Sequence, residues 1–146
     1  MKIMILNGPN INFLGIREKE IYGKENYEDI CNNLKKEGEK LNIDVNIYQS
    51  NIEGELINFL QRAYFEKYDG IIMNPGAYTH TSIALYDALK SIEIPTIEVH
   101  ISNVYKREEF RHKSITAPAC IGQICGLGSE GYLLALQYFL KILKNK

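Results

Sequence analysis

Five short runs rich in β-branched residues alternate with segments of helical character, and this alternation limits the fold more than any other feature. The runs that we expect to form strands are Lys2–Leu6, Ile43–Tyr48, Gly70–Met73, Pro95–Val99 and Ala119–Ile124. The segments that we expect to form helices are Asn26–Leu41, Ile52–Phe65, Ser82–Ile92 and Ser129–Leu143, with Asn26 and Asn51 as N-caps of the first two. Strands that alternate with helices indicate parallel βαβ units. The sequence therefore predicts an α/β chain with a flavodoxin-like, five-stranded parallel sheet of order 2-1-3-4-5 and helices on both faces.

Composition narrows the class of protein. A chain of 146 residues with 45% hydrophobic content has the size of one domain, which we expect to span residues 1–146. Its formal net charge of −1 argues against a dedicated nucleic-acid binder or a polybasic membrane anchor. No apolar run approaches the ~18 residues of a membrane span, and the first strand turns polar at Asn7, too early for a signal peptide. Three cysteines, an odd number, are most simply reduced thiols, so we expect a cytoplasmic protein.

The last predicted helix is apolar almost all round. Only Gln137 and Lys141 interrupt the run GYLLALQYFLKIL. A helix on one face of a sheet should keep a polar side. Either loops bury its outer face, or the helix takes part in a contact between subunits.

Polar side chains gather where the predicted strands end. The segments that follow or end the first four strands are Asn7–Asn10, Gln49–Asn51, Asn74–His80 and Glu98–Asn103. Because ligands bind beyond the carboxyl ends of the strands in open α/β sheets, these segments predict a mostly neutral, hydrogen-bonding pocket. Glu98 and His100 lie two apart in a strand and face the same side. The carboxylate could fix the tautomer of the histidine and favour proton donation near neutral pH. An exposed ion pair is an equally good interpretation.

The charged segment LGIREKEIYG, bounded by glycines, has the length and position of a lid over this pocket, and we place the lid at about residues 15–24. It carries Arg17 and Tyr22. A tyrosine with the ordinary pKa of about 10 is a poor base at pH 7, but a nearby guanidinium would lower that pKa. Only four of the seventeen basic residues are arginines, namely Arg17, Arg62, Arg107 and Arg111. Each could be kept for its planar fork, although surface charge is the simpler interpretation of any single one.

Two further patterns predict no site of their own. The run GLGSEG, which begins at Gly126, matches a dinucleotide-binding fingerprint, but it follows the last strand and leaves no room for the acidic partner about 20 residues on. A tight turn between strand and helix explains it better. The histidines lack the spacing of a metal site, so we expect none. Cys120 and Cys125, near the last strand, fit apolar filling.

Taken in order, these segments closely resemble the type II 3-dehydroquinate dehydratases. The blocks that carry the resemblance are ILNGPNINFLGI followed by REKEIYG, then YQSNIEGELI, MNPGAYTHTSIALYDAL, EVHISNVYKREEFRHKS and GQICGLGSEGYLLAL. They cover nearly the whole chain. The resemblance implies a flavodoxin-like subunit that removes water from 3-dehydroquinate by trans (anti) elimination through an enolate, giving 3-dehydroshikimate. This reaction serves the shikimate pathway or quinate breakdown, and the family uses no metal or redox cofactor.

Matching positions in the family imply the catalytic roles. Tyr22, as a phenolate, would remove the proton alpha to the ketone, and Arg17 would lower its pKa. Asn10 would hold the water that hydrogen-bonds the enolate. His100 would protonate the departing hydroxyl, with Glu98 orienting and charging it.

The resemblance also implies a binding set and an assembly. Arg111 would recognise the substrate alcohols, while Asn74 and the Ile101–Ser102 pair would hold the carboxylate. The binding positions are Asn74, His80, Asp87, Ile101, Ser102 and Arg111. Asp87 would reach a neighbouring subunit's site, because the family forms trimers that assemble into homododecamers. Lys19 departs from the family, where proline is common, so we expect a more flexible lid; Phe13 replaces the usual leucine and should change only packing.

A non-catalytic flavodoxin-like binding module is the main alternative. A receiver domain needs acidic residues after the first strand and an aspartate after the third, where this chain has Asn7, Asn10 and Asn74. A flavin carrier needs a phosphate loop rich in serine and threonine, and NGPN is not one. A metal-dependent hydrolase built on the histidines is a third hypothesis, which zinc that survives dialysis would support.

Overall fold

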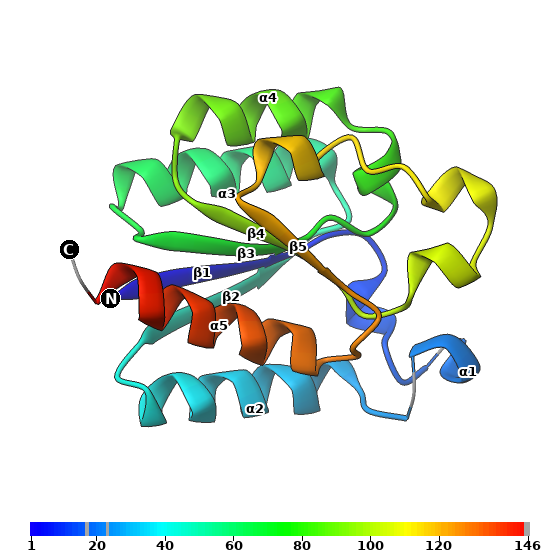
Figure 1. Cartoon of the computed structure of the whole chain (residues 1–146), viewed down its shortest axis with the longest axis horizontal. Helices are drawn as coiled ribbons and strands as arrows, with labels where there is room; N and C mark the ends of the chain where they lie inside the picture. Colours follow the sequence, from blue (N-terminus) through cyan, green and yellow to red (C-terminus); the bar gives the residue numbers. More distant parts are fainter. Residues whose placement is uncertain (17, 23, 145–146) are drawn as a thin grey trace.

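A five-stranded parallel sheet of order β2-β1-β3-β4-β5 forms the centre of the molecule, as the sequence predicts (Figure 1). The computed structural model describes residues 1–16, 18–22 and 24–144, but not the side chains of Lys19 and Tyr22. The strands are β1 (Lys2–Asn7), β2 (Asp44–Gln49), β3 (Gly70–Asn74), β4 (Thr96–His100) and β5 (Gly122–Cys125). All four strand pairs are parallel, so the carboxyl ends of the strands meet at one edge of the sheet.

Helices cover both faces of this sheet. The helices are α1 (Lys19–Tyr22), α2 (Tyr27–Lys40), α3 (Glu53–Phe65), α4 (Ile83–Ile92) and α5 (Glu130–Leu143). Figure 1 shows α2 and α5 on one face and α3 and α4 on the other. Strand β1 contributes side chains to the apolar core on both faces of the sheet. Ile3 and Ile5 pack with α2 and α5, while Met4 and Leu6 pack with α3 and α4. This alternation gives the chain two apolar layers on one buried strand.

Of the two expected N-caps, the structure confirms one, Asn26. Asn26 caps α2 through a capping box, in which it accepts from the backbone of Asp29 and the Asp29 side chain accepts in return. The prediction for Asn51 is wrong: α3 begins after Ile52, and no side chain caps it. The oxygen of Asn51 instead accepts from the backbone nitrogen of Asn10, 41 residues away. A local pattern cannot reveal this partner.

The last strand begins later than expected. The prediction places it over Ala119–Ile124, but Ala117–Ala119 form a 3-10 turn and β5 starts only at Gly122. Pro118 lies in this turn, where its fixed φ suits a helical turn better than a ladder. Two residues therefore separate this turn from β5, whereas the predicted strand includes the last residue of the turn.

Helix α5 buries one face and leaves another open. Tyr132, Ala135, Leu136 and Phe139 lie in the core, whereas Leu134 and Tyr138 stay exposed. In this single chain no loop among the described residues buries the outer face fully, so the apolar excess noted in the sequence remains at the surface. None of the helices in the described part of the chain is both long and apolar enough to cross a membrane.

Candidate active site

A cavity of about 130 Å³ opens at the carboxyl edge of the sheet, above the ends of β1, β3 and β4. Seven of the eleven residues that the sequence nominates line it: Asn10, Asn74, His80, His100, Ile101, Ser102 and Arg111. Residues from four separate segments therefore meet in one polar hollow, at the place that the topology predicts for a ligand.

The other four nominated residues are not among the described residues that line the cavity. Glu98 lies fully buried behind His100. Asp87 is exposed on α4 and does not line this cavity. Arg17 and the side chain of Tyr22 lie outside the described residues.

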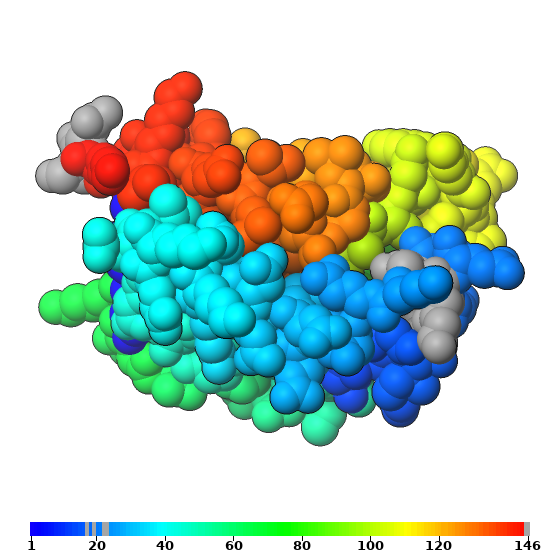
Figure 2. Space-filling view, turned by 90° about the horizontal axis from the view of Figure 1, so that it is seen from below, coloured from blue at the N-terminus to red at the C-terminus, as the bar shows by residue number. Residues whose placement is uncertain are grey.

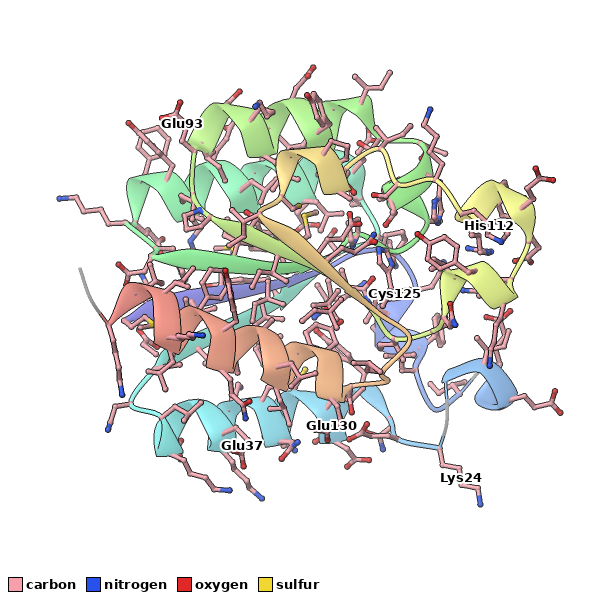
Figure 3. The ribbon with its side chains drawn as sticks, viewed as in Figure 1. Lys24, Glu37, Glu93, His112, Cys125 and Glu130 are labelled. Carbon is pink, nitrogen blue, oxygen red and sulfur yellow. The ribbon has the colours of Figure 1, made fainter. Side chains whose placement is uncertain are left out.

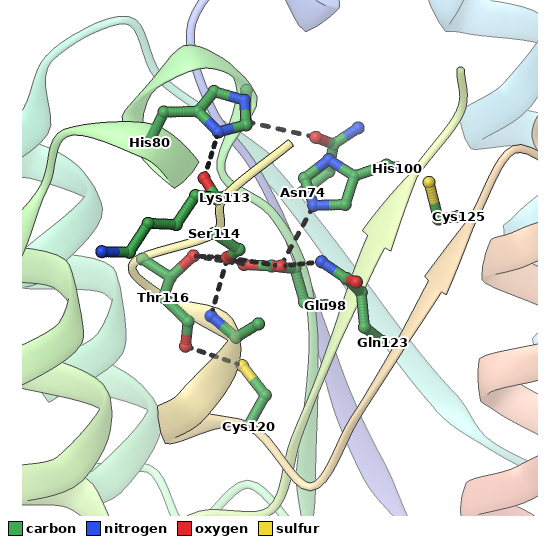
Figure 4. A network of polar contacts seen from close by, with 12 residues as sticks. Asn74, His80, Glu98, His100, Lys113, Ser114, Thr116, Cys120, Gln123 and Cys125 are labelled. Atoms are coloured by element: carbon green, nitrogen blue, oxygen red, sulfur yellow. Dashed lines mark hydrogen bonds and ion pairs between the residues drawn. The ribbon is translucent and has the colours of Figure 1, made fainter. Parts of the chain in front are cut away.

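Glu98 and His100 form a buried pair on β4 (Figure 4). Nε2 of His100 lies 3.1 Å from Oε2 of Glu98, and the two side chains are 7% and 0% exposed. The distance is that of an ion pair, although the ring is not aligned for a linear hydrogen bond. The alternative of an exposed ion pair is thus wrong. One edge of the imidazole contacts a carboxylate and the ring borders the cavity, which is the arrangement of a proton donor with its supporting anion.

Three further donors hold the Glu98 carboxylate. Gln123 on β5 donates through Nε2 to Oε2 at 2.6 Å, the Ser114 hydroxyl lies 2.9 Å from the same oxygen, and the Thr116 hydroxyl donates to Oε1. Burial alone would raise the pKa of Glu98, but the contact with His100 and the hydrogen bonds from Thr116 and Gln123 outweigh it, so the pKa lies below its ordinary value. The carboxylate therefore stays ionised although no solvent reaches it.

The Asn74 side chain is fixed at the floor of the cavity. Its Oδ1 accepts from the backbone nitrogen of Gly76 at 3.2 Å, and its Nδ2 donates to the hydroxyl of Tyr132 at 3.0 Å. His80, beside it, has Nδ1 only 2.7 Å from the carbonyl oxygen of Lys113, so Nδ1 carries the hydrogen. The cavity thus presents an amide and an imidazole whose orientations the fold has already set.

Asn10 enters the cavity from a strained turn. Its φ of 67° is left-handed, which asparagine tolerates better than most residues. The side chain of Asn51 holds this turn, since its Oδ1 accepts from the backbone of Asn10 at 3.0 Å and from Gln49 Nε2 at 3.1 Å. The end of β2 therefore positions the end of β1.

The glycine run after β5 supports the site rather than forming a nucleotide site. Gly126 and Gly128 both have positive φ, and their nitrogens donate to the carbonyls of His100 and Ile101 at 3.1 and 3.0 Å. A side chain at Gly126 would approach Cβ of Asn103 to 3.0 Å. The expectation of a tight turn is confirmed, and the turn fixes the backbone that follows β4.

Arg107 lines the cavity but is absent from the nominated residues. Its Nη1 donates to the hydroxyl of Ser102 at 3.3 Å, and its side chain is only 11% exposed. The scarcity of arginine in the sequence is a signal that points to Arg107 as a binding residue. Arg111, which is nominated, also lines the cavity and pairs with Glu108 at 2.7 Å. The cavity accordingly has two guanidinium groups among its walls.

The segment 18–22 lies close to the cavity. Its residues Lys19–Tyr22 form the short helix α1, which the sequence does not predict. Glu20 and Ile21 line a second hollow together with Ser102 and Arg107, which also line the first. Figure 2 shows this segment, in blue, beside residues 102–108, in yellow-green. The two hollows are therefore neighbours with shared walls.

The cysteines and the third histidine do not line this cavity. Burial first, and then the Glu98 charge, raise the pKa of the Cys120 thiol to about 12, so it is an inert filler. Figure 3 shows His112 in the outer loop and Cys125 at the end of β5. Across residues 1–16, 18–22 and 24–144, no three histidine, cysteine or acidic side chains gather as metal ligands would.

Comparison with known proteins agrees with this geometry. The family model described as dehydroquinase class II matches residues 1–140. The 3-dehydroquinate dehydratase of Clostridium perfringens (strain SM101 / Type A) is 64% identical over all 146 residues and is itself covered in full. That of Clostridium acetobutylicum is 68% identical over 93% of this chain and 94% of its own. The crystal structure of the type II dehydroquinase from Butyrivibrio crossotus DSM 2876 superposes with a TM-score of 0.94 at 57% identity, covering 95% of this chain and 97% of that one.

Proposed function

Since the chain belongs to the class II dehydroquinase family and is a 3-dehydroquinate dehydratase, a hydro-lyase, we propose that the cavity above β1, β3 and β4 is where it eliminates water. The observation that carries this proposal is the buried Glu98–His100 pair, whose imidazole borders a cavity walled by amides, a serine and two arginines. That set provides an acid for a leaving hydroxyl and hydrogen bonds for an oxygen-rich substrate.

The reaction needs a base, a stabiliser for the enolate and an acid. In our proposal the Tyr22 phenolate takes the proton alpha to the ketone, and the electron pair of the broken C–H bond moves into the enolate. Arg17 beside it favours the phenolate. Asn10 holds the water that hydrogen-bonds the enolate oxygen, which spreads the developing charge.

The elimination ends at His100. The enolate collapses, the C–O bond breaks, and His100 gives its proton to the departing hydroxyl, which leaves as water. Glu98 supports this step, because a buried, ionised carboxylate 3.1 Å from Nε2 stabilises the protonated ring. Each step is a proton transfer between a side chain and the substrate, so this mechanism asks for no metal or redox cofactor.

Substrate binding follows from the same walls. We propose that Asn74 and the Ile101–Ser102 pair hold the carboxylate, while Arg111 and His80 hydrogen-bond the ring hydroxyls. Arg107 orients the Ser102 hydroxyl for this task. The 15–24 segment acts as the lid, which the position of Glu20 and Ile21 beside Ser102 and Arg107 supports.

We further propose a homododecamer built as a tetramer of trimers, in which Asp87 serves a neighbouring subunit. Its exposed place on α4 and the open apolar side chains Leu134 and Tyr138 on α5 support this assembly. The three cysteines are unpaired, which suits the reducing cytoplasm. There the reaction would serve aromatic biosynthesis through the shikimate pathway, or quinate breakdown.

The direct test adds 3-dehydroquinate to chelator-treated protein and follows the ultraviolet absorbance of the conjugated enone product. We expect the product to form rapidly whether or not chelator is present. Loss of this turnover in His100→Ala would locate the reaction in this cavity. Turnover that disappears with chelator and returns with zinc would overturn the proposed mechanism.

A further inference from the structure

A chain of buried hydrogen bonds links the floor of the cavity to helix α5. The hydroxyl of Tyr132 donates to Oδ1 of Asn7 at 2.7 Å and accepts from Nδ2 of Asn74 at 3.0 Å. Asn7 and Asn74 are opposite each other in the β1–β3 pair, so both side chains point to the face that α5 covers. All three residues are 3% exposed or less.

The hydrogen bonds from Asn74 to Tyr132 and from Tyr132 to Asn7 have only one consistent assignment of donors and acceptors. Asn7 turns its oxygen toward Tyr132 and its Nδ2 toward Tyr27, 3.4 Å away. Tyr132 must therefore donate to Asn7 and accept from Asn74. Burial raises the pKa of Tyr132 and keeps the hydroxyl neutral, so it retains both roles.

The consequence falls on Asn74. Its oxygen is occupied by the nitrogen of Gly76 and one hydrogen of Nδ2 by Tyr132. A flipped amide would place its NH₂ group against the Gly76 N–H and lose both bonds. The donor that Asn74 can offer to the cavity is therefore its second N–H.

We propose that Tyr132 is a positioning residue, which fixes the Asn74 amide so that its free N–H meets an oxygen of the substrate carboxylate. This inference rests on the proposed function, because it takes from it the role of Asn74. The carboxylate does not change during the elimination, so its binding energy is the same in the ground and transition states. Loss of the Tyr132 hydroxyl should thus weaken binding far more than chemistry.

The test is Tyr132→Phe, which keeps the ring in the core and removes only the hydroxyl. We expect KM to rise about tenfold, the effect of one buried hydrogen bond, with kcat changed less than about threefold. Tyr68→Phe is the matched control: Tyr68 is 5% exposed, its hydroxyl lies 3.5 Å from that of Tyr48, and it does not line the cavity. Its KM and kcat should stay at the parent values. A KM within twofold of the parent in Tyr132→Phe overturns the proposal.

A double-mutant cycle separates positioning from general packing. Asn74→Ala alone should raise KM, and Tyr132→Phe added to it should raise KM no further, because the amide that Tyr132 orients is gone. Additive effects would show a structural role and reject the proposal. If Asn74→Ala leaves KM unchanged, the role of Asn74 in the proposed function fails too. If Asn74→Ala raises KM and Tyr132→Phe does not, only the inference fails.

A second variant guards against misfolding of the first. Asn7→Ala leaves Tyr132 intact but removes the acceptor for its hydroxyl, which can then rotate away from Asn74. We expect a rise in KM of about threefold, again with little change in kcat. An unchanged KM in a folded Asn7→Ala protein contradicts the proposal independently of Tyr132→Phe.

Discussion

Gln123 lies directly opposite Glu98 in the β4–β5 pair, and its amide nitrogen donates to the Glu98 carboxylate at 2.6 Å. The strand that carries the proposed acid is therefore joined to its neighbour by a side-chain bond as well as by the ladder. Because this carboxylate also contacts His100, the register of two strands fixes the electrostatics of the site. The packing of β5 is thus part of the chemistry.

Glu98 should make stability depend on pH. Its pKa is lowered on folding, so the unfolded chain binds a proton at a higher pH than the folded chain does. Its contribution is complete above the ordinary value of 4.5 and is lost as pH falls through the lower folded value. Glu98→Gln should reduce the free energy of unfolding by about 1–3 kcal/mol at pH 7, and the gap should narrow toward pH 3. Urea unfolding across this range measures it, and a constant gap contradicts the assignment.

The proposed base and acid predict two inactive variants with intact folds. Tyr22→Phe removes the phenolate, and His100→Ala removes the proton donor, so each should lower kcat by about 10²–10⁴-fold. Tyr64→Phe, on the exposed end of α3, is the control and should keep full turnover. The enone assay gives kcat, and circular dichroism checks the fold. Near-normal kcat in either variant removes the mechanism.

Much of the fold could be predicted because its signals are local. Buried β-branched runs and helical segments give the sheet order, and Asn26 with Asp29 marks the start of α2. Errors arise where a partner lies far along the chain. Asn51 fits a cap equally well by local pattern, but its side chain is taken by Asn10.

The same reason separates the predicted from the missed site residues. Glu98 and His100 are visible as a two-residue spacing on a strand, and the scarcity of arginine points weakly to Arg107. Nothing local distinguishes Tyr132 among ten tyrosines, because its partners lie 125 and 58 residues away. Residues that orient others are set by tertiary contacts, which a single sequence does not display.

The turn after β5 predicts a stability effect at one glycine and not at another. Gly126→Ala puts a side chain on a φ of +86° and against Asn103 at 3.0 Å, so it should cost about 1–2 kcal/mol of unfolding free energy. It should also raise KM, because the Gly126 nitrogen holds the His100 carbonyl. Gly122→Ala, with open space around it, is the matched control and should change stability by less than about 0.5 kcal/mol. Equal losses in the two variants would disprove the role of the turn.

Arg107 predicts a binding defect that a lysine does not repair. Arg107→Met removes the donor to Ser102 while keeping an apolar stem of similar length, so the serine hydroxyl loses its orientation and KM should rise about tenfold. Arg107→Lys restores the charge but not the planar fork, and it should recover less than half of the loss on a logarithmic scale. Arg62→Met, which removes the exposed ion pair between Arg62 on α3 and Glu66 just after this helix, controls for loss of a positive charge and should leave KM unchanged. If lysine restores KM fully, the charge of Arg107 matters and its geometry does not.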